Sequence, residues 1–315
     1  RQKSGLKHMP HSGQIPRHSV VGFKWWGDLS GPHLKSWLHG NVYEILWMED
    51  TTNFYKLDFS KIKSDANFYF QRLIAWSPYW IREFGSDGGG ELTSLRYEEI
   101  CVNAMILHIV NPAYEPQRRA RLEFAWYRIH GLARYQLCRC NGPIVLWEWA
   151  CSQAVEILNV IHYGPTGKIP YEHFFGIMVD YSKFYVFGCT VVIKKTARSL
   201  GAQSKHQDRA EWGVYLGWNS EQWCHITYGL DSKREFYTSD FVVFEDNFGG
   251  MKRMMGDNPG LDDKALQNAL DAIDQGEKDS AQPAPSIRRQ SWMDASTDSQ
   301  NLWKATKVTT PMDTE

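Results

Sequence analysis

The sequence predicts a mixed α/β domain, followed by a small β-barrel of the SH3-like kind and an acidic tail. Between residues 20 and 60, aromatic and β-branched residues gather in three stretches separated by turn signals, which is typical of strands. Helical spacing of apolar residues then alternates with one more strand. Beyond residue 184 the chain changes to short strands broken by Gly, Asn and Asp, which favours a small barrel.

The first region is expected to contain an antiparallel meander and two helices. A turn signal, GPHLKSWLHGN, separates the first two strand-like stretches and favours their antiparallel pairing. In order, the expected elements are strands at 22–28, 41–50 and 54–59, a helix at 63–76, a strand at 79–87 and a helix at 94–104.

Two longer helices are expected in the middle of the chain, at 119–137 and 146–163, because apolar residues recur on one face. The apolar positions of the first helix are Leu122, Trp126, Ile129, Ala133 and Leu137. The strands expected after these helices lie at 189–195, 211–218, 223–229 and 234–244.

Composition places the chain among globular proteins, with 43% hydrophobic and 23% charged residues and a formal charge of −1. The short apolar runs disfavour membrane spans, and near-neutral charge gives no argument for nucleic-acid binding by itself. The near-zero net charge hides a difference between two parts of the chain. Residues 249–315 contain 8 basic and 11 acidic residues, whereas residues 1–248 contain 27 basic and 25 acidic residues. We expect this acidic tail, with its Ser, Asp, Gln and Pro, to be a disordered linker.

Six cysteines lie in the middle of the chain without a CxxC pair, so reduced thiols are expected. The N-terminus is polar and lacks the apolar segment of a secretory signal, which predicts an intracellular protein. His8, His11 and His18 lie there, but they cannot complete a His₂Cys₂ zinc site without a CxxC pair. A solvated polar arm is favoured, and no zinc is expected.

Three acidic residues stand out by their placement: Asp28 and Asp87 end predicted strands, and Glu123 lies within a helix. Such a trio can converge on one face of a mixed sheet and serve metal-assisted phosphoryl transfer, which uses two Mg²⁺ ions about 3.5–4 Å apart. The simpler alternative is ordinary turn chemistry for the aspartates and a solvated helix face for the glutamate. Three glycines follow Asp87, which lets the backbone turn sharply beside a ligand.

The segments around these acids resemble the integrase region of Copia-type (Ty1/copia) retrotransposon Pol polyproteins. WGDLSGP and GNVYEILWMEDTTNF resemble that family's Asp-x-x-Gly-Pro segment and its following Gly-x-x-Tyr strand. REFGSDGGGEL resembles its Arg-x-Asp-Asn-Gly-Gly-Glu-Phe segment, and PQRRARLEF resembles Pro-Gln-x-Asn-Gly-x-x-Glu-Arg. Asp87 and Glu123 are separated by 35 residues, as in the family's Asp,Asp-35-Glu signature.

Further matches follow in the same order along the chain. LWEWACSQAVEILN, IPYEHFFG and FYVFGCTVVI resemble the family's Leu-Trp-x-Glu-Ala helix, its Thr-Pro-Tyr-Glu segment and its Val-Phe-Gly-Cys segment. RAEWGVYLGW and YTSDFVVFEDN match its closing β-domain. The predicted organisation is a polar arm at 1–19, an RNase H-like catalytic core at 20–165, a connector at 166–183, an SH3-like domain at 184–248 and a disordered linker at 249–315.

The resemblance implies an integrase that trims element DNA 3′ ends and joins them to target DNA. It implies that Asp28, Asp87 and Glu123 are catalytic and bind Mg²⁺ or Mn²⁺, as two ions. DNA is the implied partner, with a homo-oligomer as the active form, the nucleus as its location and no membrane association. The chain resembles a polyprotein fragment that begins past the family's zinc module and stops before a reverse transcriptase.

Departures from the family pattern leave other functions open. Gly88, Arg119 with Ala120, and Phe124 replace the family's Asn, Asn-Gly pair and Arg. A catalytically inactive relic that binds DNA non-specifically is one alternative. An unrelated RNase H-like nuclease, which would cleave without joining, is another, and the C-terminal β-domain motifs disfavour it.

Basic residues suggest where DNA would bind. Six arginines and one acidic residue lie between Arg118 and Arg139, and we predict phosphate contacts from Arg118, Arg119 and Arg121. A solvated helix face is the equally weighted alternative. Lys194 and Lys195 begin a second basic cluster, which is either a DNA-binding or a solubilising loop. The fourteen tryptophans are expected to pack in the core.

Overall fold

The first sheet has the mixed topology of an RNase H-like domain. The computed structural model describes residues 17–86, 92–110, 116–163, 166–195 and 210–256, without the side chains of 116–119. The sheet order is β3-β2-β1-β4-β5, in which β1, β2 and β3 pair antiparallel and β4 and β5 continue parallel to β1. Its strands are β1 (Lys24–Ser30), β2 (Tyr43–Glu49), β3 (Tyr55–Ser60), β4 (Glu83–Ser86) and β5 (Leu107–Val110).

The predicted meander, helix, strand and helix are confirmed, and β5 is an element that sequence patterning did not predict. Helix α1 (Ala66–Trp76) follows a short 3₁₀ turn at Lys63–Asp65, and α2 (Leu95–Asn103) begins where the Ser94 hydroxyl accepts a hydrogen bond from the Tyr97 amide. The four residues of β5 are a weak local signal, because their strand conformation depends on pairing with β4.

Alternating side chains of the sheet divide into two hydrophobic clusters. Trp25, Ile45 and Trp47 pack with α1 and α2 on one face. Trp26 and Leu46 pack on the other face, beneath α3 (Pro116–Arg139) and α4 (Trp147–Val160). A sheet covered by helices on both faces must be apolar on both, which explains the nearly continuous hydrophobic character of β2.

The second sheet contains five antiparallel strands in the order β10-β6-β7-β8-β9. They are β6 (Thr190–Lys194), β7 (Ala210–Asn219), β8 (Cys224–Gly229), β9 (Arg234–Thr238) and β10 (Phe241–Phe244). The predicted small SH3-like β-barrel is this five-stranded sheet, and within the described residues its edge strands β9 and β10 do not pair, so it does not close. One face packs on helices through Val214 and Leu216, so it is buried without closure of the sheet on itself.

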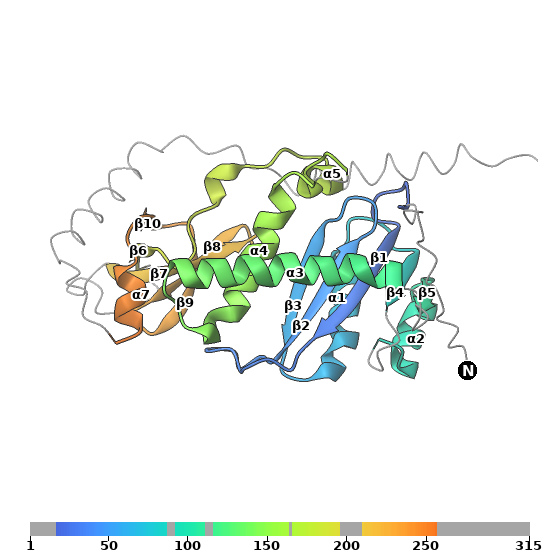
Figure 1. Ribbon diagram of the computed structural model, residues 1–315, viewed down its shortest axis with the longest axis horizontal. Helices are drawn as coiled ribbons and strands as arrows, with labels where there is room; N and C mark the ends of the chain where they lie inside the picture. Colours follow the sequence, from blue (N-terminus) through green and yellow to red (C-terminus); the bar gives the residue numbers. More distant parts are fainter. Residues whose placement is uncertain (1–16, 87–91, 111–115, 164–165, 196–209, 257–315) are drawn as a thin grey trace, which may run out of the picture.

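Helix α3 joins the two sheets. Figure 1 shows it running from the first sheet to the second, and its 24 residues span about 36 Å. The buried residues Leu122 and Ile129 at one end and Leu137 at the other belong to one hydrophobic cluster that also includes Val214 of β7. The predicted amphipathic helix is confirmed, and its buried face forms a core that both sheets share.

Four short elements complete the described chain: a 3₁₀ turn at Ile144–Leu146, α5 (Pro170–Phe175), a 3₁₀ turn at Tyr181–Lys183 and α7 (Gly249–Met254). Phe174 of α5 is fully buried in the cluster beneath α1. Helix α7 occupies the first residues of the predicted linker and buries Met251. Most of that linker lies outside the described residues. None of the six cysteines forms a disulfide, and no helix in the described parts could cross a bilayer.

Candidate functional site

Asp28 lies in β1 on the face of the sheet that α3 covers. Its backbone pairs with Leu46 of β2, and its half-buried side chain is held from two directions. The Leu29 amide donates to Oδ1 over 2.9 Å, and the indole Nε1 of Trp126 donates to Oδ2 over 2.9 Å. The carboxylate of the first predicted acidic residue is therefore oriented toward α3.

Glu123 lies three residues before Trp126 in α3, and its side chain is exposed. Leu122 and Ala125 face the core, which fixes the rotation of this turn relative to the sheet. Through Trp126, the structure brings Asp28 beside the helical turn that carries Glu123. The sequence pattern indicated only a packing role for Trp126, and this hydrogen bond could not be predicted from it.

Asp87, the third predicted acidic residue, lies outside the described residues. The described sheet nevertheless reaches the residue before it, because the parallel pairing of β1 and β4 ends with Gly27 opposite Ser86. The Ser86 hydroxyl lies 2.9 Å from Nε2 of His108 and is fully buried. The strand that leads into Asp87 is thus anchored next to the strand that carries Asp28.

The described basic residues have different surroundings. Arg121 forms an ion pair with the Asp50 carboxylate and donates to the Asp50 carbonyl oxygen over 2.9 Å, so it joins α3 to the end of β2. Burial alone would raise the pKa of Asp50, but the Arg121 charge and hydrogen bonds outweigh it and lower that pKa. Lys194 and Lys195 are half-buried at the end of β6. A DNA contact by any of these three residues stays a prediction.

The other predicted DNA contacts and the histidines of the polar arm are only partly described. Arg118 and Arg119 belong to α3, and their side chains lie outside the description. His8 and His11 also lie outside it. The ring of His18 stacks on Phe23 at 4.1 Å between centroids, so this end of the arm packs on the domain.

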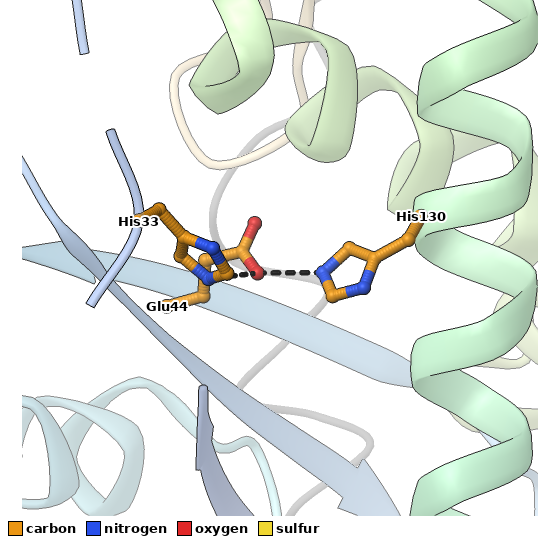
Figure 2. A group of neighbouring side chains, drawn as sticks. All are labelled: His33, Glu44 and His130. Carbon is orange, nitrogen blue, oxygen red and sulfur yellow. Dashed lines mark hydrogen bonds and ion pairs between the residues drawn. The ribbon is translucent and has the colours of Figure 1, made fainter. Parts of the chain in front are cut away.

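A cluster that the sequence did not predict is formed by His33, Glu44 and His130, and we call it the two-histidine cluster (Figure 2). Oε2 of Glu44 lies 3.2 Å from Nε2 of His33 and 2.7 Å from Nε2 of His130. Burial alone would raise the pKa of Glu44, but the two histidine hydrogen bonds lower it to about 2. The sequence contained one signal of this cluster, because Glu44 alternates with Leu46 and Met48 along β2 and so lies on the same buried face of the strand.

A second cluster, formed by His39, Glu148 and Glu235, contains one histidine and two glutamates, and we call it the one-histidine cluster. Nδ1 of His39 lies 2.7 Å from Oε1 of Glu148, and Nε2 lies 3.3 Å from Oε2 of Glu235. The Glu148 and Glu235 carboxylates raise the pKa of His39 to about 10. This cation joins the segment after β1 to α4 and to β9, and therefore links the two sheets.

The sequence of this chain is similar to that of a retrotransposon polyprotein. No protein-family model matches the chain. The chain is 24% identical over 227 residues to the retrovirus-related Pol polyprotein from transposon TNT 1-94 of Nicotiana tabacum. The resemblance to Copia-type Pol polyproteins is confirmed. The match covers 70% of this chain, which spans 17% of the length of that polyprotein.

Solved structures similar to this chain include integrases. The HTLV-2 integrase catalytic core domain in complex with magnesium is 18% identical, with a TM-score of 0.40, over 50% of this chain and 98% of that one. The BIV integrase catalytic core is 20% identical, with a TM-score of 0.39, over 49% and 95%. The simian T-cell lymphotropic virus intasome in complex with PP2A regulatory subunit B56 gamma is 15% identical, with a TM-score of 0.46, over 67% and 78%.

The two described acidic residues, Asp28 and Glu123, have the donor atoms that suit a hard divalent cation. Each carboxylate oxygen of Asp28 accepts one of the hydrogen bonds described above, and carboxylate oxygens are ligands that hard cations prefer. Glu123 presents an exposed carboxylate from the adjoining turn of α3. Oxygen donors of this kind suit Mg²⁺ or Mn²⁺.

Proposed function

We propose that this chain is the integrase region of a Copia-type element and carries out metal-dependent phosphoryl transfer on DNA. It would trim the 3′ ends of element DNA and join them to target DNA. The hydrogen bond from Trp126 to Asp28 is the observation that carries the proposal. It links the strand and the helix on which the family resemblance places two of the three catalytic acids.

In this proposal Asp28, Asp87 and Glu123 hold two Mg²⁺ or Mn²⁺ ions. The ions would activate the attacking oxygen and stabilise the leaving oxygen when they are bound. Trp126 positions the Asp28 carboxylate, since its indole N–H donates to Oδ2. Arg121 holds α3 on the sheet through Asp50, so the helix that carries Glu123 stays in place. The protein's contribution is positioning and charge stabilisation.

The partners and organisation belong to the same proposal. We assign DNA as substrate, a homo-oligomer as the active form and the nucleus as the site of action. Residues 20–165 would form the catalytic core, 166–183 the connector and 184–248 the DNA-associated β-domain. Arg118, Arg119, Arg121, Lys194 and Lys195 would contact DNA phosphates, which predicts a binding affinity that falls as salt rises.

An assay that joins a labelled terminal-repeat duplex to a supercoiled plasmid in Mn²⁺ tests this function. Asp28→Asn and Glu123→Gln are expected to reduce joining by at least about 100-fold, because each removes a carboxylate charge from the proposed metal site. Glu99→Gln is the matched control, since Glu99 is an exposed acid on α2. Equal joining by wild type and Glu123→Gln would contradict the proposal, and nicking without joining would indicate an RNase H-like nuclease.

A catalytically inactive relic is the second candidate function. Phe124 replaces the arginine of the family pattern and is 50% exposed. Its ring is stacked with that of Tyr127, with 6.5 Å between the ring centroids. An exposed aromatic ring at this position cannot pair with a phosphate. DNA binding that weakens with salt, without metal-dependent nicking or joining, would identify the relic. Activity gained by Phe124→Arg would connect the loss to this substitution.

A further inference from the structure

The two-histidine cluster contains none of the three acids of the proposed catalytic site, and it combines imidazole nitrogens with a carboxylate oxygen. We propose that it binds one divalent transition-metal ion of the zinc class, with His33, Glu44 and His130 as its protein ligands. The ligands come from the segment after β1, from β2 and from α3, as Figure 2 shows. The bound ion would therefore connect three elements of the first domain.

The spacing of the three donor atoms suits such an ion. One atom from each residue lies within 4.8 Å of the other two, and Glu44 Oε2 is 2.7 and 3.2 Å from the two Nε2 atoms. Tetrahedral zinc, with bonds of about 2.0–2.1 Å to nitrogen and oxygen, separates its ligands by about 3.3 Å. The shorter contact needs to open by only about half an ångström to accommodate the ion.

The surroundings hold the ligands in place. Glu44 has a side chain only 1% exposed, and the Cys151 thiol hydrogen-bonds to its carboxylate. The ring of His130 stacks on Trp126 at 5.1 Å between centroids, and the ring of His33 lies 5.1 Å from that of Trp147. Fixed rings and a supported carboxylate are what a metal site needs around its ligands.

Access and donor chemistry select the kind of ion. The side chains of His33 and His130 are 30% and 31% exposed, so solvent can reach the site and supply a water as fourth ligand. The hydroxyl oxygen of Ser30 also lies at this site, 3.3 Å from Nε2 of His33. Two imidazole nitrogens favour Zn²⁺ or Co²⁺ over Mg²⁺, which prefers oxygen ligands.

This site differs from the zinc module that sequence analysis considered. That module needs a His₂Cys₂ set, and its absence led to the expectation of no zinc. The two-histidine cluster needs no cysteine ligand and is assembled from residues far apart in the sequence. An ion bound at the two Nε2 atoms requires each imidazole to carry its hydrogen on Nδ1, so the Nε2 hydrogen leaves to solvent while Nδ1 takes one up, and a net proton is released only from a doubly protonated ring.

Cobalt and zinc binding to the full-length chain, stripped with a chelator, tests the site. Wild type is expected to bind one more Co²⁺ than the His33→Gln/His130→Gln double variant, with a visible absorption band that Zn²⁺ removes and Mg²⁺ does not. Each single variant should weaken this binding by at least about 100-fold. His162→Gln is the matched control, since His162 is an exposed histidine outside the cluster.

Stability gives a second readout that does not depend on catalysis. Zinc at 100 times its dissociation constant should raise the Tm of wild type and His162→Gln by roughly 5–10 °C, but not that of the double variant. If His130→Gln fails to fold, His33→Gln on its segment outside regular structure provides the same comparison. Equal metal binding by wild type and the double variant, or no binding by wild type, would overturn the proposal and leave a hydrogen-bonded triad only.

Discussion

The two histidine–glutamate clusters contain the same side chains in inverse proportions. In the two-histidine cluster a single buried carboxylate oxygen accepts from two imidazoles. In the one-histidine cluster a single imidazole lies between two carboxylates that are 8% and 11% exposed. Two carboxylates repel unless a cation lies between them, whereas one carboxylate with two imidazoles forms a ligand set for a metal. The ratio of acid to base therefore separates an ion-pair clamp from a candidate metal site.

The largest effect is expected from His39→Ala in the one-histidine cluster. It would leave Glu148 and Glu235 facing each other without a counter-charge, and should lower the free energy of unfolding by about 2 kcal/mol. A fully buried pair would lose about 3–5 kcal/mol, and the 39% exposure of His39 reduces this. Urea unfolding measures the loss, with His162→Ala expected within about 0.5 kcal/mol of wild type. A neutral effect of His39→Ala would mean that the cluster is no clamp.

A pH series sharpens the same contrast. The folded pKa of His39 is about 10, above its usual 6.5, so its contribution to stability is complete below pH 6.5 and is lost as pH rises toward 10. We expect wild type to lose on the order of 1 kcal/mol more than His39→Gln over this interval, after allowance for solvent screening. Thermal unfolding at stepwise pH measures the difference. Parallel curves would show that His39 does not retain its proton.

The smallest effect is expected from Glu44→Gln in the two-histidine cluster, measured in the presence of a chelator. The amide can accept from one imidazole N–H and donate to a ring nitrogen of the other histidine. The loss should be no more than about 1 kcal/mol, near the value of one hydrogen bond. Urea unfolding of Glu44→Gln and His39→Ala under the same conditions ranks the two losses in the free energy of unfolding. A loss larger than that of His39→Ala would reverse the comparison.

Local sequence patterns predicted the elements that have strong periodicity. The amphipathic pattern from Leu122 to Leu137 appears as the buried face of α3, and the three strands of the meander form as expected. The same patterns missed β5, and they could not indicate whether the edge strands of the predicted SH3-like β-barrel would pair. Both features depend on pairing between distant strands, and alternation within one strand carries no information about its partner.

The candidate site likewise has features that the local sequence predicted and contacts that it could not predict. The sequence placed Asp28 and Glu123 on their strand and helix, because the motifs around them are contiguous. It could not reveal that Trp126 would donate to Asp28, or that Arg121 would be held by Asp50. Such contacts depend on how α3 lies across the sheet, and that is settled by packing of the shared hydrophobic cluster.

By itself the sequence determined the order and type of most elements, the family resemblance and the positions of two described acids. Only the tertiary structure assembled His33, Glu44 and His130, which are separated by up to 97 residues. It alone also placed His39 between α4 and the second sheet. The physical reason is that periodicity arises from neighbours along the chain, whereas a cluster of charges arises from the folding of distant segments onto one core.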